Sequence, residues 1–492
     1  MLRSPMRPGV RLLLAACSGV FFTLLYDPFD ATALAWITIT PLLLALDDAS
    51  PLMGAALGWV TGTVGSAGIT AHWIYCAARD YFDLAPLAAA GFAFGATQIL
   101  GAIHVALFGL AVTLLPRRRW RAMVVAALFV ATEYQRAHLP LGGPWTFLGQ
   151  SQTNLMLMQL SDFTGVQGMS FVCALVASAL VDIRRTRVPL VVAALLLTVV
   201  CIYGQWRLSG AASVPDATLR VALVQGNLPN HQRGRPEFFS AHLDQYLDLS
   251  RSVLTPRPDL IVWPENAVGF FIEENPPLLQ RITDLLQEPG ASLLAGAPRS
   301  LSQSGIALIY NSAYLLSRNG IDGFYDKRRL LPFVERMPLR GVDGPYAIGG
   351  APTVFSLSAV RFGALICYEA IYPELARDLV QRGARLLVNI SNDSWFDAGA
   401  GPVQHYALAR FRSVENRVSL VRVANSGVSG VIDPYGREIA HLPQNAAASI
   451  SVNVPLGSGD SFYSRHGEWF ALLCIVASIA ALLWGIFARR RS

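Results

Sequence analysis

Charged side chains are scarce in this sequence. They make up 15% of its 492 residues, and hydrophobic residues make up 53%, whereas an average globular protein carries roughly 25% charged residues. This composition excludes an intrinsically disordered chain and a single ordinary soluble domain. The scarcity is uneven, because residues 1–205 carry 21 charged side chains and the 260 residues of 206–465 carry 47. The chain therefore divides into an apolar part and a more polar part.

Lysine is almost absent. Of the 39 basic residues 38 are arginine, and Lys327 is the only lysine. Mutational drift toward arginine codons accounts for the 38 but not for the one that remains. The eight histidines show no zinc-ligand spacing, and we find no helix-turn-helix, finger or RNA-binding motif. We therefore expect no metal, no cofactor and no nucleic-acid partner, in spite of the net charge of +6.

The apolar part predicts a membrane domain of eight helices, seven within residues 1–206 and a last one within 466–492, which ends in a short tail. A helix that spans a bilayer needs about 20 apolar residues, and backbone in contact with lipid must form its hydrogen bonds internally, which favours helices. The apolar stretches are 12–26, 31–46, 51–71, 85–115, 121–136, 165–183, 188–206 and 468–487.

Arginine clusters in the short loops predict the orientation, because basic residues accumulate on the cytoplasmic side of membrane helices. With eight spans, all four clusters fall on one side, so both termini are expected to be cytoplasmic and residues 207–465 extracytoplasmic. The clusters are Arg3, Arg7 and Arg11; Arg117, Arg118, Arg119 and Arg121; Arg184, Arg185 and Arg187; and Arg489, Arg490 and Arg491.

The more polar part, residues 207–465, predicts an α/β domain, because strand-like runs alternate with helical patterns. The predicted helices cover 237–254, 277–287, 373–382 and 403–416. The predicted strands cover 219–225, 260–263, 292–295, 310–316, 360–366, 386–390, 420–424, 428–432 and 448–452.

Cysteine is also rare, and Cys367 is the only one of the six in the extracytoplasmic domain. That domain cannot form an internal disulfide, so Cys367 is either a buried structural residue or a reactive nucleophile, with pairing to Cys76 as a minor third possibility. Its context favours the nucleophile. An apolar strand runs directly into Cys367, and Pro373 opens a helix soon afterwards. Such a strand-to-helix elbow exposes a nucleophile and offers backbone N–H groups to an oxyanion.

Two more polar residues follow strands in the same manner. Glu265 follows the buried strand 260–263, and Lys327 follows a short strand that ends at Asp326. Glu265 can act as a base for the Cys367 thiol, and the compact ammonium of Lys327 can stabilise a thiolate or an oxyanion, which the broad arginine fork does less well. Taken singly, Glu265 could be a helix cap and Lys327 a surface charge, but together the three residues form a workable catalytic set.

These residues and several motifs resemble the apolipoprotein N-acyltransferase family of the nitrilase superfamily. Glu265, Lys327 and Cys367 are similar to the Glu-Lys-Cys triad of that superfamily. The further motifs are Pro144-Trp145, Leu148-Gly149-Gln150-Ser151-Gln152, Gly165-Val166-Gln167-Gly168-Met169-Ser170-Phe171, Ser391-Asn392-Asp393-Ser394-Trp395-Phe396, and Gln404-His405 with Ala409-Arg410-Phe411-Arg412.

The resemblance implies an αββα nitrilase-like sandwich facing the periplasm on an eight-helix base in the bacterial inner membrane. It implies a ping-pong reaction in which Cys367 takes an acyl group from a phospholipid such as phosphatidylethanolamine and passes it to the N-terminal amine of a diacylated lipoprotein. A monomer is expected.

The resemblance also implies roles for single residues. Glu265 would be the general base, and Lys327 with the Tyr368 backbone N–H would form the oxyanion site. Glu335 would support them, Glu369 would lie in the pocket and Trp395 would be an aromatic at the pocket lid. The chain departs from the family in having Val334 where a glycine usually precedes the supporting glutamate.

Two other functions are compatible with parts of the sequence. One is an amidase or nitrilase that happens to be anchored in a membrane, although a single anchor would then suffice. The other is a non-enzymatic lipid-binding or scaffold protein, against which the complete set of Glu265, Lys327 and Cys367 argues. His405 is expected to pack or to form hydrogen bonds rather than to bind a metal.

Overall fold

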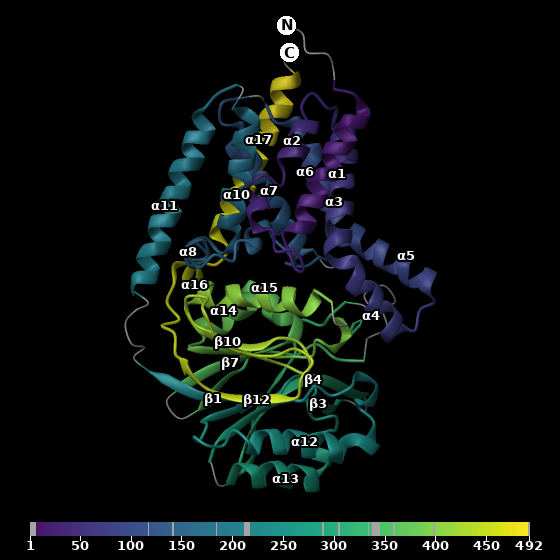
Figure 1. Cartoon of the computed structure of the whole chain (residues 1–492), viewed down its shortest axis with the longest axis vertical. Helices are drawn as coiled ribbons and strands as arrows, with labels where there is room; N and C mark the ends of the chain where they lie inside the picture. The colour runs from purple at the N-terminus through teal and green to yellow at the C-terminus, as the bar shows by residue number, and fades with distance from the viewer. Residues whose placement is uncertain are drawn as a thin grey trace. The chain divides into compact units, whose positions relative to one another are not determined.

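The computed structural model describes the chain except for a few short segments; the described residues are 6–116, 118–139, 142–183, 185–210, 217–287, 290–303, 306–332, 334–336, 345–357, 360–396 and 399–490. The chain forms two compact units (Figure 1). One consists of Met1–Ala212 with His466–Ser492, and the other of Ser213–Arg465. Among the predicted orientation markers, Arg3, Arg117, Arg184 and Arg491 lie outside the described residues.

The first unit is helical. It contains a large cluster of buried aliphatic and aromatic side chains, and α17 packs against α7 and α10 although it lies far from both in the sequence. The helices are α1 Pro8–Leu24, α2 Thr40–Ala45, α3 Pro51–Ser66, α4 His72–Phe82, α5 Pro86–Thr97, α6 Ile103–Leu114, α7 Arg121–His138, α8 Leu155–Met158, α9 Ser161–Thr164, α10 Val166–Asp182, α11 Val188–Gly210 and α17 Trp469–Arg490.

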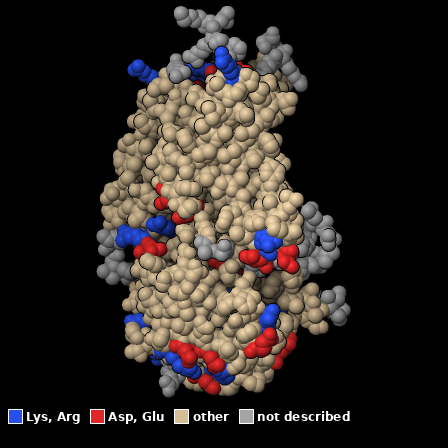
Figure 2. Space-filling model, turned by 45° about the vertical axis from the view of Figure 1, so that its right-hand side comes forward, with Lys and Arg blue, Asp and Glu red and all other residues tan. Residues whose placement is uncertain are grey.

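Four helical segments among the described residues are long and apolar enough to cross a membrane: Pro51–Asp80, Pro86–Leu114, Val188–Gly210 and Trp469–Ala488. A fifth is possible if Leu155–Thr164 and Val166–Asp182, which meet at 116°, are counted as one broken span. This is fewer than the eight predicted. The segment 31–46 breaks into a 3-10 turn and the short α2, α1 has only 17 residues, and α7 carries polar residues such as Glu133 and Arg136. Figure 2 shows a broad stretch of the helical unit's surface with no Lys, Arg, Asp or Glu.

Two of the arginine clusters meet at one end of this unit. Arg11 Nη1 donates to the backbone oxygen of Asp47 at 2.8 Å, and Arg185 Nη2 lies 2.8 Å from the Asp47 carboxylate. The first turn of α1 and the last turn of α17 lie at the same end (Figure 1).

The segment 142–152, which is irregular except for the 3-10 helix Leu148–Ser151, is buried inside the helical unit. Buried backbone groups need hydrogen-bond partners, and side chains supply them here. The Glu133 carboxylate accepts from the Leu148 N–H at 2.6 Å, and the Tyr26 hydroxyl donates to the Phe147 carbonyl at 2.7 Å. The segment contains two of the motifs that carry the family resemblance, so these motifs lie within the packed interior.

In the described residues of the second unit there are two six-stranded sheets. The first has the order β12-β1-β2-β3-β4-β5, and the second has the order β11-β10-β9-β8-β7-β6. The strands of the first sheet are β1 Thr218–Gln225, β2 Leu260–Val262, β3 Ser292–Gln303, β4 Ile306–Ser317, β5 Gly320–Asp326 and β12 Ala448–Pro455. Those of the second are β6 Val354–Leu357, β7 Val360–Ile366, β8 Leu386–Ser391, β9 Ser419–Ala424, β10 Ser429–Ile432 and β11 Glu438–Leu442.

The two sheets face each other, and each is covered by helices on its outer side (Figure 1). Helices α12 Phe239–Arg251 and α13 Pro276–Gln287 cover the first sheet, and α14 Pro373–Gln381 and α15 Gly401–Asn416 cover the second. This is the predicted αββα sandwich. Strands β6 and β11 were not predicted; they lie at the two edges of their sheet, where one neighbour is missing and the apolar pattern is weaker.

The centre of each sheet is parallel. Strands β1, β2 and β3 run in the same direction, as do β7, β8 and β9. Residues that follow β2 and β7 therefore emerge at the carboxyl ends of buried parallel strands, the usual location of sites in such sheets. Glu265 and Cys367 occupy these positions.

Candidate active site

Lys327 is the centre of a buried polar cluster in the α/β unit. Its ammonium donates to Glu265 Oε1 at 3.1 Å and to Glu335 Oε1 at 2.9 Å. The side chains of all three residues are at most 9% exposed. The structure thus brings together three of the residues singled out in the sequence, from separate loops that follow β2 and β5.

Asn311 completes this cluster and was not predicted. From the middle of β4 its Nδ2 donates to Glu265 Oε1 at 2.7 Å and to Glu335 Oε1 at 2.9 Å. Its backbone carbonyl accepts from the Lys327 N–H at 2.9 Å. The sequence does contain an indication of this role, because Asn311 is a polar amide on a strand whose other residues are largely apolar.

The charges in the cluster are unequal: one ammonium lies between two carboxylates. Burial by itself lowers the pKa of Lys327, but Glu265, Glu335 and the neighbouring Cys367 outweigh it, and the pKa is raised well above its ordinary value. Lys327 is therefore a permanent cation. An ammonium has three N–H groups, and the two carboxylates occupy two of them, which leaves one donor direction for a developing negative charge.

Cys367 occupies the predicted elbow. It follows β7 directly, begins the 3-10 turn Cys367–Ile371 and is 3% exposed. Its φ is +51°, a left-handed conformation that few residues other than glycine adopt. Such strain typically costs about 1–3 kcal/mol and is kept where the surroundings hold it in place, as at the nucleophile of a strand-to-helix elbow.

The thiol of Cys367 is electrostatically coupled to the Lys327 cluster. Burial and the negative charge of Glu265 raise the pKa of Cys367 to about 12, although Lys327 acts in the opposite direction. The resting residue at neutral pH is consequently a thiol and not a thiolate. Attack on a carbonyl then requires a base, and Glu265 is the carboxylate that acts most strongly on this thiol.

Glu369 lies beside Cys367 in the sequence, but its carboxylate is fully buried and points into the protein. Oε1 accepts from the Tyr325 hydroxyl at 2.8 Å and from the backbone N–H groups of Arg328 and Arg329 at 2.7 and 3.1 Å, and Oε2 accepts from the Ile366 N–H at 2.8 Å. Glu369 therefore ties the loop that carries Lys327 to the strand that carries Cys367. Burial raises the pKa of Glu369, and these hydrogen bonds oppose the rise.

The remaining predicted residues, Tyr368 and Trp395, are aromatic and mostly buried. Tyr368 is 9% exposed, and its ring meets that of Tyr372 edge to face at 5.2 Å. Trp395 is also 9% exposed and stacks on Phe396 with the ring centres 3.7 Å apart.

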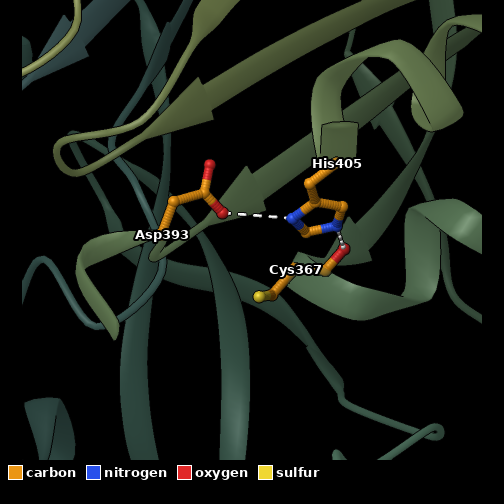
Figure 3. A group of neighbouring side chains, drawn as sticks. All are labelled: Cys367, Asp393 and His405. Carbon is orange, nitrogen blue, oxygen red and sulfur yellow. Dashed lines mark hydrogen bonds and ion pairs between the residues drawn. The ribbon is translucent and has the colours of Figure 1, made fainter. Parts of the chain in front are cut away.

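Cys367, Asp393 and His405 form a second group, in which one possible ligand atom from each residue lies within 4.8 Å of the others. Figure 3 shows the imidazole between the two other residues: Nδ1 faces the Asp393 carboxylate at 3.1 Å, and Nε2 faces the backbone oxygen of Cys367 at 3.2 Å. Asp393 is also paired with Arg422 at 2.8 Å. A metal ion would have to displace the guanidinium and break at least one of the imidazole contacts, so the donor set fits a hydrogen-bond network and not a metal centre.

Family models match both units. The model of the apolipoprotein N-acyltransferase N-terminal domain matches residues 18–179, and the model of carbon-nitrogen hydrolases matches residues 220–462. The second match agrees with the nitrilase-like α/β fold of the unit that contains Cys367.

Relatives resemble this chain over nearly its whole length. Apolipoprotein N-acyltransferases of Geobacter metallireducens, Azotobacter vinelandii and Pseudomonas aeruginosa are 36%, 34% and 32% identical, over 98%, 97% and 97% of this chain and 96%, 95% and 96% of their own. A solved amidase of the nitrilase superfamily from Nesterenkonia, 20% identical, covers 53% of this chain and 99% of its own with a TM-score of 0.41. The similarity of the full-length relatives shows that this chain belongs to the apolipoprotein N-acyltransferase family.

Proposed function

We propose that this protein transfers a fatty acyl group from a membrane phospholipid to the N-terminal amine of a diacylglyceryl-cysteine lipoprotein, through a thioester on Cys367. The observation that supports this most directly is the buried cluster of Glu265, Lys327 and Glu335, of which Glu265 and Lys327 act electrostatically on a cysteine held at a positive φ. Membership of the family supplies the two substrates, with phosphatidylethanolamine as the proposed donor.

In the first half-reaction the Sγ of Cys367 attacks the ester carbonyl of the phospholipid. Glu265 takes the thiol proton, the S–C bond forms, and the carbonyl electron pair moves to the oxygen. Lys327 Nζ and the Tyr368 backbone N–H stabilise this oxyanion, an effect that commonly accounts for a large part of enzymatic rate enhancement. When the intermediate collapses, the C–O bond breaks and Glu265 returns the proton to the departing lysophospholipid.

In the second half-reaction the lipoprotein amine attacks the thioester. The C–N bond forms, the C–S bond breaks, and the proton released by the amine passes through Glu265 to the leaving Cys367 sulfur. Glu265 thus alternates between base and acid. It takes up one proton and returns it in each half-reaction, so the net charge of the protein is unchanged at the end of each.

The supporting residues have different tasks in this scheme. Glu335 shares the Lys327 ammonium and the Asn311 amide with Glu265, and it therefore holds both in position. Glu369 fixes the Lys327 loop against the Cys367 strand. Trp395 is proposed to line the lipid entrance.

The helical unit is proposed to cross the bacterial inner membrane eight times, with both termini cytoplasmic and residues 207–465 periplasmic. The meeting of Arg11 and Arg185 at Asp47 supports this orientation, because basic residues from different loops then lie on one side. The shorter helices, such as α1, would span a thinned bilayer or be shielded by their neighbours. A single chain supplies the complete cluster, so the enzyme is proposed to act as a monomer.

Acyl transfer is tested on the purified full-length protein. It is incubated in detergent with phosphatidylethanolamine labelled in its acyl chains and without an acceptor. We expect a hydroxylamine-labile label on the wild type and none on Cys367→Ala. A diacylated lipopeptide added afterwards should take the label onto its amine. An unlabelled wild type, or a label that persists in Cys367→Ala, would refute the thioester, and transfer to water alone would favour a hydrolase.

The topology is tested by fusing a reporter after Ser492. Reporter activity that requires the cytoplasm supports the eight-span arrangement, and activity that requires the periplasm contradicts it.

A further inference from the structure

The backbone carbonyl of Cys367 accepts hydrogen bonds from two buried side chains. Asn389 Nδ2, from β8, lies 3.3 Å from this oxygen, and His405 Nε2, from α15, lies 3.2 Å from it. Both side chains are completely buried. A carbonyl oxygen has two lone pairs, so the two donors satisfy it fully.

We propose that His405 and Asn389 are positioning residues, which hold and polarise the peptide unit between Cys367 and Tyr368 so that its N–H can stabilise the oxyanion. This inference rests on the function proposed above. The peptide unit is planar and rigid, and in its trans form the N–H points opposite to the C=O. Fixing the oxygen of Cys367 on one edge therefore fixes the N–H of Tyr368 on the other.

The two hydrogen bonds also act on the strength of the N–H donor. Hydrogen bonds in a chain polarise one another, because charge drawn toward an amide oxygen makes the N–H of the same amide more positive. The effect is larger in a buried site, where water does not screen it.

The positive φ of Cys367 makes such support necessary. At φ +51° the elbow is strained, and a relaxed backbone would rotate the Cys367–Tyr368 peptide away from the site. Among the described residues, the contacts from Asn389 and His405 are the side-chain hydrogen bonds that oppose this rotation directly.

One guanidinium aligns both donors. Arg422, from β9, donates through Nη1 to Asn389 Oδ1, and its Nη2 lies 3.0 Å from His405 Nδ1 and 2.8 Å from Asp393 Oδ2. Because the Cys367 carbonyl can only accept, Nε2 of His405 must carry a proton. Burial and Arg422 lower the pKa of His405, while Asp393, 3.1 Å from Nδ1, and the Cys367 carbonyl oppose the decrease. With or without a second proton on Nδ1, the ring keeps the Nε2 proton that it donates to the Cys367 oxygen.

A different role for the same residues is a Cys-His-Asp triad with His405 as the general base. The geometry disfavours it. In Figure 3 the imidazole bonds to the Cys367 backbone oxygen and not to the sulfur, and a nitrogen that already donates a proton cannot accept one from the thiol. The two roles lead to opposite expectations for glutamine in place of His405, because glutamine can donate to a carbonyl but cannot act as a base.

The test compares two reactions of Cys367 in the purified full-length protein. Acylation by labelled phosphatidylethanolamine passes through an oxyanion, whereas alkylation by iodoacetamide, followed on the Cys367 peptide by mass spectrometry, is a displacement at saturated carbon and does not. In His405→Leu we expect acylation to slow by about 10- to 100-fold, which is at most the lower end of the effect of removing a direct oxyanion donor. Alkylation should keep the wild-type rate. His405→Gln should recover most of the acylation rate.

The control is His441→Leu, which replaces an exposed histidine of β11 and should leave both reactions unchanged. Asn389→Asp preserves the acceptor for Arg422 and removes the donor to the Cys367 and Leu365 carbonyls, so it should slow acylation as His405→Leu does and provides the comparison if His405→Leu does not fold.

Equal loss of acylation and alkylation, a wild-type acylation rate in a folded His405→Leu or Asn389→Asp variant, or complete inactivity of a folded His405→Gln would overturn the inference. An unlabelled wild type would instead overturn the proposed function itself.

Discussion

Replacing Lys327 by arginine tests whether the only lysine of the chain has a role that a second kind of cation cannot fill. The ammonium lies 3.1 Å from Glu265 Oε1 and 2.9 Å from Glu335 Oε1 and is 2% exposed. Arginine keeps the positive charge, so the two buried carboxylates remain paired. The penalty of about 3–5 kcal/mol that follows removal of one partner from a buried ion pair should therefore not appear.

The larger guanidinium must nevertheless fit into a space enclosed by Asn311 and the two carboxylates. Overpacking of a buried site costs about 1–3 kcal/mol, so we expect a moderate decrease in the free energy of unfolding. The compact donor that faces the oxyanion is lost, and removal of one such donor slows catalysis about 10²- to 10³-fold. Lys327→Arg should therefore remain folded and acylate at least about 100-fold more slowly.

The assay is the rate of hydroxylamine-labile labelling from phosphatidylethanolamine, with thermal unfolding measured on the same preparation. The matched control is Arg382→Lys, the reverse exchange at an exposed ion pair with Asp378, where only about 0.3–0.5 kcal/mol is at stake. A folded Lys327→Arg variant with a rate close to that of the wild type would refute the reasoning from the single lysine.

Three further predictions concern stability. Glu369→Gln places an amide N–H₂ among the hydroxyl and three backbone N–H groups that the carboxylate now accepts; it should lower the free energy of unfolding by about 1.5–3 kcal/mol, and an unchanged melting temperature would contradict this. Asn311→Leu removes the amide that bridges two carboxylates and should destabilise the protein by at least a similar amount, measured by the shift of the thermal midpoint. The pKa of His405 in the folded protein is lowered from 6.5, so the unfolded chain binds a proton more readily than the folded protein as the pH falls below about 6.5. The stability of the wild type should therefore decline between about pH 6.5 and 5. The stability of His405→Gln should decline less, which thermal melts of both proteins across that range would measure.

Much of the α/β unit is visible in the sequence because its central strands are buried on both faces. The runs 219–225 and 386–390 are apolar except for Arg220, Gln225 and Asn389, and such nearly continuous apolar runs are the pattern of parallel strands covered by helices. The edge strands β6 and β11 escape notice because they are paired on one side only. In the helical unit, hydropathy locates the apolar segments but does not show whether each forms one continuous helix. The segment 31–46, for example, is divided into two short helices.

The sequence by itself determined the three residues that were proposed to carry the chemistry, because a unique lysine, a single cysteine of the outer domain and a glutamate after a buried strand are each unusual in composition or position. The sequence could not determine which residues hold these three side chains in position. Asn311, Asn389 and Arg422 are separated from their partners by 16 to 46 residues along the chain. The pairing of β2, β3, β4 and β5 in one sheet and of β7, β8 and β9 in the other brings them together. The chemistry of a side chain can be read from its type, but the direction in which it donates is fixed by strands that meet only in the folded protein.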